Sequence, residues 1–227
     1  MPNLLENPVL RLMTLLECSK SRWVLGLAGV PGSGKTTVAE KWAEAVNGVM
    51  GPGTMVALGM DGFHLTREQL RQFPDPEEAF ARRGAPWTFD PAAMAKRLRK
   101  VRETMGSADV AWPRFRHEIR DPEEGAFVVP ASARLVLVEG LYLLHQDDGW
   151  AEVAACFDER WFLDTPVETA LERLAQRHMQ VWDWTREQAE HRIATNDRLN
   201  AETVLRSRET ADWVVQSWKS GDPEVWR

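Results

Sequence analysis

The sequence predicts an α/β fold of three layers, in which helices cover both faces of a central five-stranded parallel sheet. Three observations predict it: short apolar runs without the alternation of half-exposed strands, helical periods between these runs, and a length of 227 residues, which suits one large domain. The runs expected to form the strands lie at residues 23–28, 55–60, 135–138, 160–163 and 213–215.

Helices are expected between these strands. Glu6, Arg11 and Glu17 interrupt the N-terminal stretch, so we expect a short amphipathic helix there rather than a secretory signal. A second helix is expected at residues 35–47, and a third opens at residues 90–91. Residues 165–168 form a capping box that predicts a fourth, and Thr185 with Gln188 predicts a fifth that runs past residue 200. Residues 127–130 are expected to return from a hairpin.

The composition excludes several classes of protein. With 44% hydrophobic and 27% charged residues the chain is typical of soluble domains, and its apolar runs are shorter than the roughly 20 residues that cross a membrane. The net charge of −6 disfavours a nucleic-acid partner. Cys18 and Cys156 lack metal-binding spacing, so a reducing, cytoplasmic environment is expected. Without repeats or linkers, residues 1–227 predict one domain, as a monomer or homodimer.

A phosphate-binding loop follows the first predicted strand directly. Residues 29–36 read Gly-Val-Pro-Gly-Ser-Gly-Lys-Thr and match the pattern GxxxxGK[ST], with a strand before and an amphipathic helix after. Backbone N–H groups of such a loop surround phosphate oxygens, and the helix adds its positive end. A chance match in a glycine-rich turn is the alternative. The residues predicted to bind the nucleotide are Gly29, Val30, Pro31, Gly32, Ser33, Gly34, Lys35, Thr36 and Thr37.

This loop predicts ATP and Mg²⁺ as cofactors. Lys35 is expected to reach the β- and γ-phosphates, and the Thr36 hydroxyl to bind the metal. The sequence has no NKxD segment for guanine and no LSGGQ-like signature of a transporter ATPase. The third predicted strand ends in the single carboxylate Glu139 rather than an Asp-Glu pair. Of the classes of P-loop protein considered, a small-molecule kinase and an uncoupled NTPase remain.

Asp61 follows the second predicted strand, where open α/β sheets bind their ligands. Its carboxylate could accept a proton from an acceptor hydroxyl or hold Mg²⁺ through water. The alternative is that Asp61 caps the next turn. His64, three residues on, is expected either to line a pocket or simply to pack.

Five segments of the chain carry a resemblance to a known family. In order, they are residues 29–36, 60–64 (Met-Asp-Gly-Phe-His), 83–90 (Arg-Gly-Ala-Pro-Trp-Thr-Phe-Asp), 112–115 (Trp-Pro-Arg-Phe) and 138–142 (Val-Glu-Gly-Leu-Tyr). The chain resembles P-loop kinases of the phosphoribulokinase/uridine kinase family over about residues 22–215. The second and third segments are specific to its branch of nucleoside, sugar or pantothenate kinase-like proteins.

The resemblance implies a P-loop NTPase fold with an acceptor-side insertion at about residues 62–130 and a helical lid at about residues 173–200. It implies that Asp61 is the catalytic base and that Glu139 helps to hold Mg²⁺. The residues placed at the acceptor are His64, Arg83, Asp90, Phe115, Arg120 and Tyr142. Asp90 could instead be an N-cap before Pro91, and Arg83 part of a solvated basic pair with Arg82.

One segment departs from the family pattern. Relatives often read Pro-x-Tyr-Asp where residues 113–116 read Pro-Arg-Phe-Arg, so a cation stands where the family has an aspartate that is associated with acceptor hydroxyls. With His117 and Arg120, Arg114 and Arg116 form a basic stretch that could favour a negatively charged acceptor. The alternative is a mobile, solvated hairpin.

The predicted lid carries candidate catalytic arginines. Arg173 and Arg177 are four residues apart, so they share one face of the helix that follows residue 165. An arginine over the transferred phosphoryl group stabilises its charge, and a closing lid excludes water. The family's lid pattern fits Arg177-His178, Asn196-Asp197 and Asn200-Ala201. An ordinary exposed basic face is the alternative.

Two functions of different class follow. The first is a kinase that phosphorylates a hydroxyl of a small metabolite, such as a nucleoside, a sugar or a pantothenate-like alcohol. The second is a nucleotide-binding switch that hydrolyses ATP slowly and has no metabolite acceptor. A deep pocket between Asp61, Arg83 and residues 112–120 would favour the first, and a flat surface the second.

Overall fold

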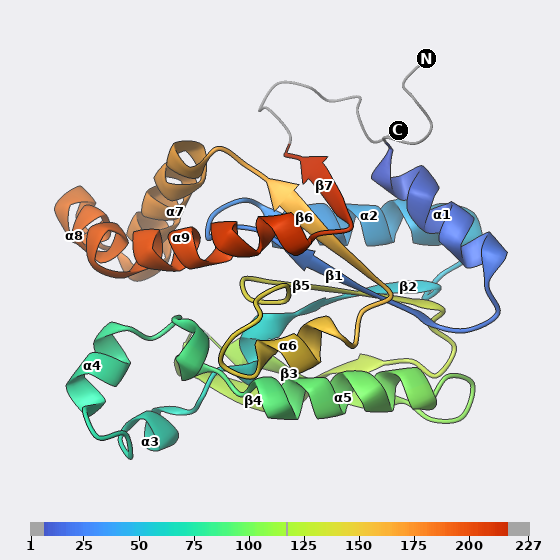
Figure 1. Ribbon diagram of the computed structural model, residues 1–227, viewed down its shortest axis with the longest axis horizontal. Helices are drawn as coiled ribbons and strands as arrows, with labels where there is room; N and C mark the ends of the chain where they lie inside the picture. The colour runs from blue at the N-terminus through green and yellow to red at the C-terminus, as the bar shows by residue number, and fades with distance from the viewer. Residues whose placement is uncertain (1–6, 117, 218–227) are drawn as a thin grey trace.

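The computed structural model describes residues 7–116 and 118–217, and its described residues form the predicted sheet (Figure 1). Five parallel strands lie in the order β2-β5-β1-β6-β7, which confirms the α/β prediction. The strands are β1 (Trp23–Ala28), β2 (Met55–Gly59), β5 (Leu135–Gly140), β6 (Glu159–Asp164) and β7 (Trp213–Gln216).

Helices cover both faces of this sheet because successive strand residues point to opposite sides. Leu25 and Leu27 of β1 belong to one apolar core, whereas Val24 and Ala28 belong to the other. Figure 1 shows α1 (Pro8–Cys18) and α2 (Lys35–Met50) on one face, and α5 (Pro91–Glu103) with α6 (Trp150–Ala154) on the other. Both faces are therefore dry, which explains why the strands lack alternation.

Several helices begin at side-chain caps, two of which the sequence predicted. Asn7 caps α1, and Asp90 caps α5 by accepting from the main-chain N–H of Ala93 at 2.8 Å. Thr185 and Gln188 form the predicted capping box, which opens α8 (Arg186–Arg192). The helix continues through a π-helical segment (Ile193–Asp197) into α9 (Arg198–Arg206), past residue 200 as predicted.

The capping box predicted at residues 165–168 is wrong. Helix α7 (Val167–Trp182) begins without a side-chain cap. The Thr165 hydroxyl donates instead to the main-chain oxygen of Ser33 at 3.2 Å, and Glu168 pairs with Arg198 at 2.9 Å. Both side chains are taken by partners distant in sequence, which a local pattern does not reveal.

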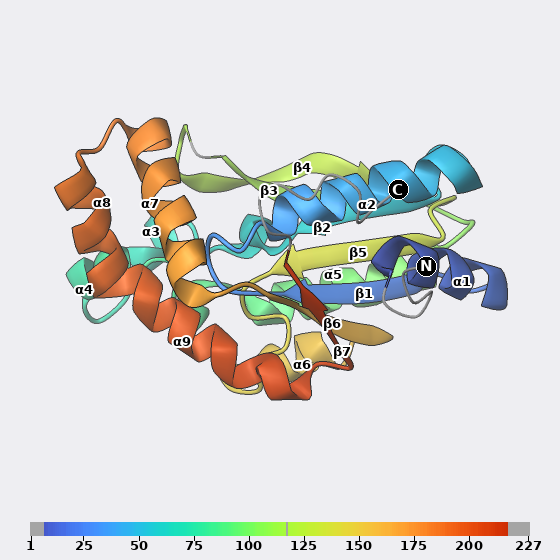
Figure 2. The same ribbon diagram turned by 90° about the horizontal axis from the view of Figure 1, so that it is seen from above.

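A hairpin stands beside the β2 edge of the sheet (Figure 2). Its strands β3 (Val110–Arg116) and β4 (Asp121–Val129) are antiparallel, and the latter contains the predicted returning segment. The Trp112 indole N–H donates to the Gly59 carbonyl at 3.0 Å, which fastens the hairpin to the end of β2. A Cβ at Gly62 would lie 2.1 Å from the Pro113 oxygen, so this close approach requires glycine.

Two short helices, α3 (Arg67–Leu70) and α4 (Pro76–Ala81), precede α5 on the hairpin side, and α7, α8 and α9 lie across from them at the same end of the molecule (Figure 1). The described residues also include 3₁₀ turns at Met60–Phe63, Pro86–Thr88 and Ser207–Thr210. None of the described helices combines the length and apolar character that crossing a membrane requires.

Candidate active site

The phosphate-binding loop joins β1 to α2, as the sequence predicts. Gly32 and Gly34 adopt left-handed backbone conformations, with φ of 76° and 92°. A Cβ at Gly32 would lie 2.1 Å from the main-chain oxygen of Ala170, so the loop approaches the lid helix α7 too closely for any other residue. The left-handed glycines and the close approach to α7 therefore fix the shape of the loop.

Lys35 is buried beneath this loop. Its ammonium group donates to the main-chain oxygens of Gly29 and Val30, at 2.9 and 3.1 Å. Burial lowers the pKa of Lys35, and the charges of Glu139 and Asp61 oppose that change. Carbonyl groups of the loop thus hold Lys35, the lysine that the motif predicts will contact the nucleotide phosphates.

Three oxygen-bearing side chains meet at the carboxyl edge of the sheet. The Thr36 hydroxyl donates to Glu139 Oε1 at 2.9 Å, and Glu139 pairs in register with Gly59 of β2, two residues before Asp61. Burial raises the pKa of Glu139 to about 7, against the lowering effect of Lys35. Among the described residues no group of three or more histidine, cysteine or acidic side chains could hold a metal.

This donor set fits Mg²⁺ all the same. Mg²⁺ is commonly held by one or two carboxylates, with phosphate and water oxygens completing its shell. Thr36 and Glu139 supply hard oxygen atoms beside the phosphate-binding loop, and Asp61 lines the same cavity. The chemistry of these donors therefore suits a magnesium ion carried in with a nucleotide.

Two cavities open at this edge. One, the β2-edge cavity, has a volume of about 400 Å³ and lies among α2, the end of β2 and the hairpin. The other, the lid cavity, has a volume of about 330 Å³ and lies between the lid and the segment from Asp61 to Phe89. Asp61, Phe115 and Arg177 line both cavities. A group at Asp61 can therefore meet one ligand from each side.

The lid rests on the α4 side of its cavity. The Arg192 guanidinium donates to the main-chain oxygens of Ala81 and Arg83, at 2.6 and 2.8 Å. The Asn196 amide also donates to the Arg83 oxygen, at 3.2 Å. The segment predicted to be the lid therefore contacts the α4 side of this cavity.

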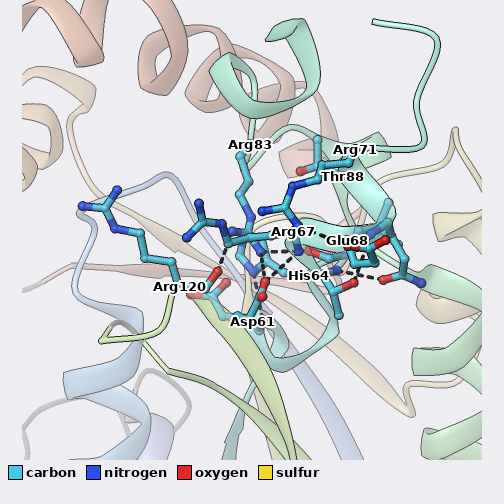
Figure 3. Close-up of polar contacts among 12 residues, drawn as sticks. Asp61, His64, Arg67, Glu68, Arg71, Arg83, Thr88 and Arg120 are labelled. Atoms are coloured by element: carbon cyan, nitrogen blue, oxygen red, sulfur yellow. Dashed lines mark hydrogen bonds and ion pairs between the residues drawn. The ribbon is translucent and has the colours of Figure 1, made fainter. Parts of the chain in front are cut away.

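His64 and Phe115, both expected at the acceptor, line the lid cavity. The His64 ring lies 3.9 Å from the Phe89 ring and 4.7 Å from the Phe115 ring, measured between centroids. Its Nδ1 is 2.8 Å from the main-chain oxygen of Asp61 (Figure 3). His64 thus both packs and faces the cavity, so the two alternatives for this residue coexist.

Arg83 also lines the lid cavity, but its guanidinium is occupied. It pairs with Asp121 at 3.0 Å and donates to the main-chain oxygens of Leu65 and Arg120, at 2.8 and 2.6 Å (Figure 3). Burial lowers the pKa of Arg83, and the pair with Asp121 opposes this. The alternative of a solvated basic pair is therefore wrong for Arg83, which is half-buried and paired.

Two residues expected at the acceptor lie outside both cavities. Asp90 is occupied as the cap of α5, which is the alternative its sequence context allowed. Tyr142 is buried, and its hydroxyl donates to the Gly84 carbonyl at 2.6 Å. Because Gly84 does line the lid cavity, Tyr142 supports the wall from behind rather than forming it.

The two candidate lid arginines differ in position. Arg177 lines both cavities, whereas Arg173 lines neither. Helical spacing puts them on one face, but one helical turn of about 5.4 Å separates them along α7. Arg177 is therefore the one that shares both cavities with Asp61.

The basic residues of the hairpin do not gather at one place in the structure. Arg114 lines the β2-edge cavity and Arg120 the lid cavity, whereas His117 lies outside the described residues. Arg116, which replaces the family's aspartate, lines neither and pairs with Glu118 and Glu123, at 3.3 and 2.9 Å. The departure from the family pattern does not by itself put a cation in a cavity.

Arg67 and an aromatic wall were missed by the sequence reasoning. Arg67 lines the lid cavity at the first turn of α3, and the capping box of Thr66 and Gln69 was the signal that could have placed it. On the lid side, His178 stacks on Trp182 with centroids 4.6 Å apart. His178 Nε2 is 2.9 Å from Asp197 Oδ2, which joins the two halves of the family's lid pattern.

Comparison with known proteins extends the resemblance noted for the sequence. Residues 24–222 match the model of the Phosphoribulokinase / Uridine kinase family. The ATP-dependent kinase-like protein notR' of Aspergillus versicolor is 38% identical over 166 residues, which are 70% of this chain and 95% of the relative. The uncharacterized protein YggC of Escherichia coli K12 is 33% identical over 223 residues, which are 95% of this chain and 87% of the relative.

Solved structures share the fold. A candidate fructose transport system kinase from Silicibacter sp. TM1040 has a TM-score of 0.79 at 28% identity, over 93% of this chain and 98% of that chain. YFH7 of Saccharomyces cerevisiae, a candidate P-loop kinase with a circular permutation, has a TM-score of 0.74 at 21% identity, over 90% of this chain and 95% of that chain. The second likeness concerns the fold alone.

Proposed function

The chain belongs to the phosphoribulokinase/uridine kinase family, and we propose that it transfers the terminal phosphoryl group of ATP to a hydroxyl group of a small molecule, with Mg²⁺. The observation that carries this proposal is the position of Asp61 and Arg177, which line both cavities. A base and a cation at this junction suit a reaction between two ligands that enter from opposite sides.

The phosphate-binding loop and Lys35 hold the nucleotide. The loop's N–H groups and the start of α2 attract phosphate oxygens, and the left-handed glycines fix the shape of the loop. Lys35 exchanges the main-chain oxygens of Gly29 and Val30 for phosphate oxygens when the nucleotide enters. Its buried charge is then compensated by anions rather than by neutral carbonyl groups.

Thr36 and Glu139 would hold the metal, and Asp61 lines the same cavity. When bound, Mg²⁺ neutralises charge on the β- and γ-phosphates. Glu139 must be ionised to take part. Burial raises the pKa of Glu139 to about 7 and so disfavours the ionised carboxylate. The charge of Lys35, and of any cation that binds beside Glu139, favours ionisation.

Asp61 acts as the general base. Its carboxylate accepts the proton of the acceptor hydroxyl, and the hydroxyl oxygen forms the new bond to phosphorus as the bond to the ADP oxygen breaks. Arg177 stabilises negative charge on the transferred phosphoryl oxygens, because it reaches the junction from the lid side. The predicted lid, when closed, keeps water, the competing acceptor, away from the junction.

The alternative of a slow ATP-hydrolysing switch finds less support. That function needs no second cavity, whereas here the lid cavity lies among Asp61, Arg83, Phe115 and Arg120. A pocket among these residues favours the kinase over the switch. Its walls come from the segment after β2, the hairpin and the lid, together with Pro31 of the phosphate-binding loop and Leu141 after β5.

The proposal is tested by the release of ADP from ATP and Mg²⁺ in the presence of small hydroxyl compounds. The panel contains nucleosides, sugars, sugar phosphates and hydroxy acids, each measured against an acceptor-free background. We expect at least one compound to stimulate ADP release strongly and to appear as a phosphorylated product by mass spectrometry. Slow ADP release that no acceptor changes would favour the switch.

A further inference from the structure

The lining of the lid cavity has more arginines than carboxylates, although the whole chain is acidic. The chain has a net charge of −6. The charged residues lining the lid cavity are the arginines Arg67, Arg83, Arg120, Arg177 and Arg192 and the carboxylates Asp61 and Asp197. Asp197 is already bonded to His178 at 2.9 Å. The cavity therefore concentrates cations in an acidic protein, which favours an anionic ligand.

Some of these arginines have structural partners and others do not. Arg83 is paired with Asp121, and Arg192 donates to main-chain oxygens of the α4 side. Within the part of the chain that the structure describes, no ion pair or hydrogen bond engages the guanidinium groups of Arg67 and Arg120. Arg177 likewise has no such partner among the described residues but lines both cavities, so Arg67 and Arg120 are the unengaged arginines that line the lid cavity alone.

The fold holds Arg67 and Arg120 around one ion pair (Figure 3). Asp121 Oδ1 accepts from the main-chain N–H of Arg67 at 2.8 Å and from the Arg83 guanidinium at 3.0 Å. Arg83 in turn donates to the main-chain oxygen of Arg120, which has a left-handed backbone with φ of 55°. An arginine is seldom found in that conformation, so its surroundings keep it there.

Three cations gathered at one place repel one another. The positive charges of Arg67 and Arg120 both contribute to lowering the pKa of Arg83. Arg67 also lies over the Phe80 ring, 6.0 Å from its centroid, which orients the side chain without neutralising it. A bound anion would relieve this repulsion, and guanidinium groups bind carboxylate and phosphate oxygens with two parallel hydrogen bonds.

We propose that the acceptor is an anion: a hydroxyl compound that also carries a carboxylate or phosphate group, which Arg67 and Arg120 bind. This inference rests on the proposed function and names the class of its substrate. Asp61 lies at the junction of the cavities, whereas Arg67 and Arg120 line the lid cavity alone. The anionic group and the reacting hydroxyl therefore bind at different points.

Pro31 of the phosphate-binding loop also lines the lid cavity, so this cavity adjoins the nucleotide phosphates, but the metal position lies outside it. Thr36 and Glu139, which surround the metal position, line the β2-edge cavity, and neither Arg67 nor Arg120 lines it. The phosphate-binding loop and Lys35 already serve the nucleotide phosphates. Arg177, which lines both cavities, is placed for the transferred group.

The test compares matched neutral and anionic acceptors in the ADP-release assay. The pairs are glycerol with glycerate, fructose with fructose 6-phosphate, and glucose with gluconate. We expect an anionic member to be preferred over its neutral partner by at least about tenfold in kcat/KM, from one charge-assisted contact. Comparing the carboxylate compounds with the phosphate compound shows which of the two anionic groups the cavity prefers.

Arg67→Gln and Arg120→Gln are the test variants, and Arg71→Gln is the matched control. Arg71 follows α3, pairs with Glu68 at 3.1 Å and does not line the lid cavity. Each test variant is expected to raise the KM of the anionic acceptor about 10- to 100-fold while kcat changes little, because the contact is the same in the ground and transition states. Arg71→Gln should leave KM unchanged.

A binding measurement separates this inference from the proposed function. Calorimetry with a non-hydrolysable ATP analogue at saturation, so that the phosphate-binding loop is filled, measures binding of the same compounds without turnover. Binding of anionic members that is lost in the Arg67→Gln/Arg120→Gln double variant supports the inference even if no ADP is released. Preference for neutral members, equal affinity in the double variant, or no binding of any anionic member overturns it.

Discussion

The Thr165 hydroxyl donates to the main-chain oxygen of Ser33 at 3.2 Å, which joins the start of the lid helix to the phosphate-binding loop. Thr165→Val removes the donor and keeps the shape of the side chain. We expect the free energy of unfolding to fall by about 1 kcal/mol, since a buried carbonyl loses its partner. Urea denaturation measures this. Thr203→Val, which removes a bond within α9, is the control, and equal losses in both would contradict the idea.

Lys35→Ala should reduce turnover at least about a hundredfold, because a preorganised cation at the phosphates is lost. The fold should persist, since a buried ammonium group is removed rather than created. Steady-state kinetics and circular dichroism measure the two effects. Lys96→Ala on the exposed face of α5 is the control and should change neither. A near-normal rate would remove the role given to Lys35.

Asp61→Asn should abolish phosphorylation of the acceptor and leave ATP affinity within a few-fold. The amide keeps the size of the side chain but does not accept the hydroxyl proton. Product formation and nucleotide binding by calorimetry are the two measurements. A collapse of ATP binding instead would assign Asp61 to the metal or to the fold.

Arg177→Gln and Arg173→Gln form a matched pair on α7. Because Arg177 lines both cavities and Arg173 neither, we expect Arg177→Gln to lower kcat by about 10³-fold and Arg173→Gln by far less. Steady-state kinetics at saturating ATP and acceptor measures both. Equal losses would mean that the lid moves during the reaction and brings Arg173 to the phosphoryl group.

Glu139 predicts a pH dependence of stability in the absence of nucleotide. Burial raises its pKa from 4.5 to about 7, so the folded protein binds a proton that the unfolded chain releases. The resulting stability is present below pH 4.5 and is lost as the pH rises through 7, by at most about 3 kcal/mol. Glu139→Gln removes this loss, so its advantage over the natural protein should grow between pH 5 and 8. Thermal unfolding that shows the same gap at every pH would contradict this assignment.

Much of the fold could be predicted because apolar runs and helix caps are recognisable in short stretches of sequence. The strands are continuous apolar runs, and their polar ends, such as Glu159 and Asp164 of β6, were missed because nothing local distinguishes them from loops. The box at Thr165 failed because Ser33, which takes its hydroxyl, lies 132 positions earlier in the chain. Local patterns therefore locate elements better than they assign side-chain partners.

The candidate site was predicted where a motif carries its residues. The phosphate-binding loop, Asp61 and Glu139 follow three parallel strands, so the topology brings them together. Arg67 was missed because it belongs to a four-residue helix whose place against the hairpin depends on Asp121. Choosing between Arg173 and Arg177 required the packing of α7 above the loop.

Arg83 joins three separate parts of the molecule. Its carbonyl accepts from Arg192 and Asn196 of the lid, and its guanidinium holds the hairpin at Asp121 while its own segment follows α4. The lid and the hairpin are thus both bonded to Arg83, at the wall of the lid cavity. If the predicted lid opens, it breaks the two bonds to the Arg83 carbonyl, so its movement acts on the same residue that holds the hairpin at Asp121.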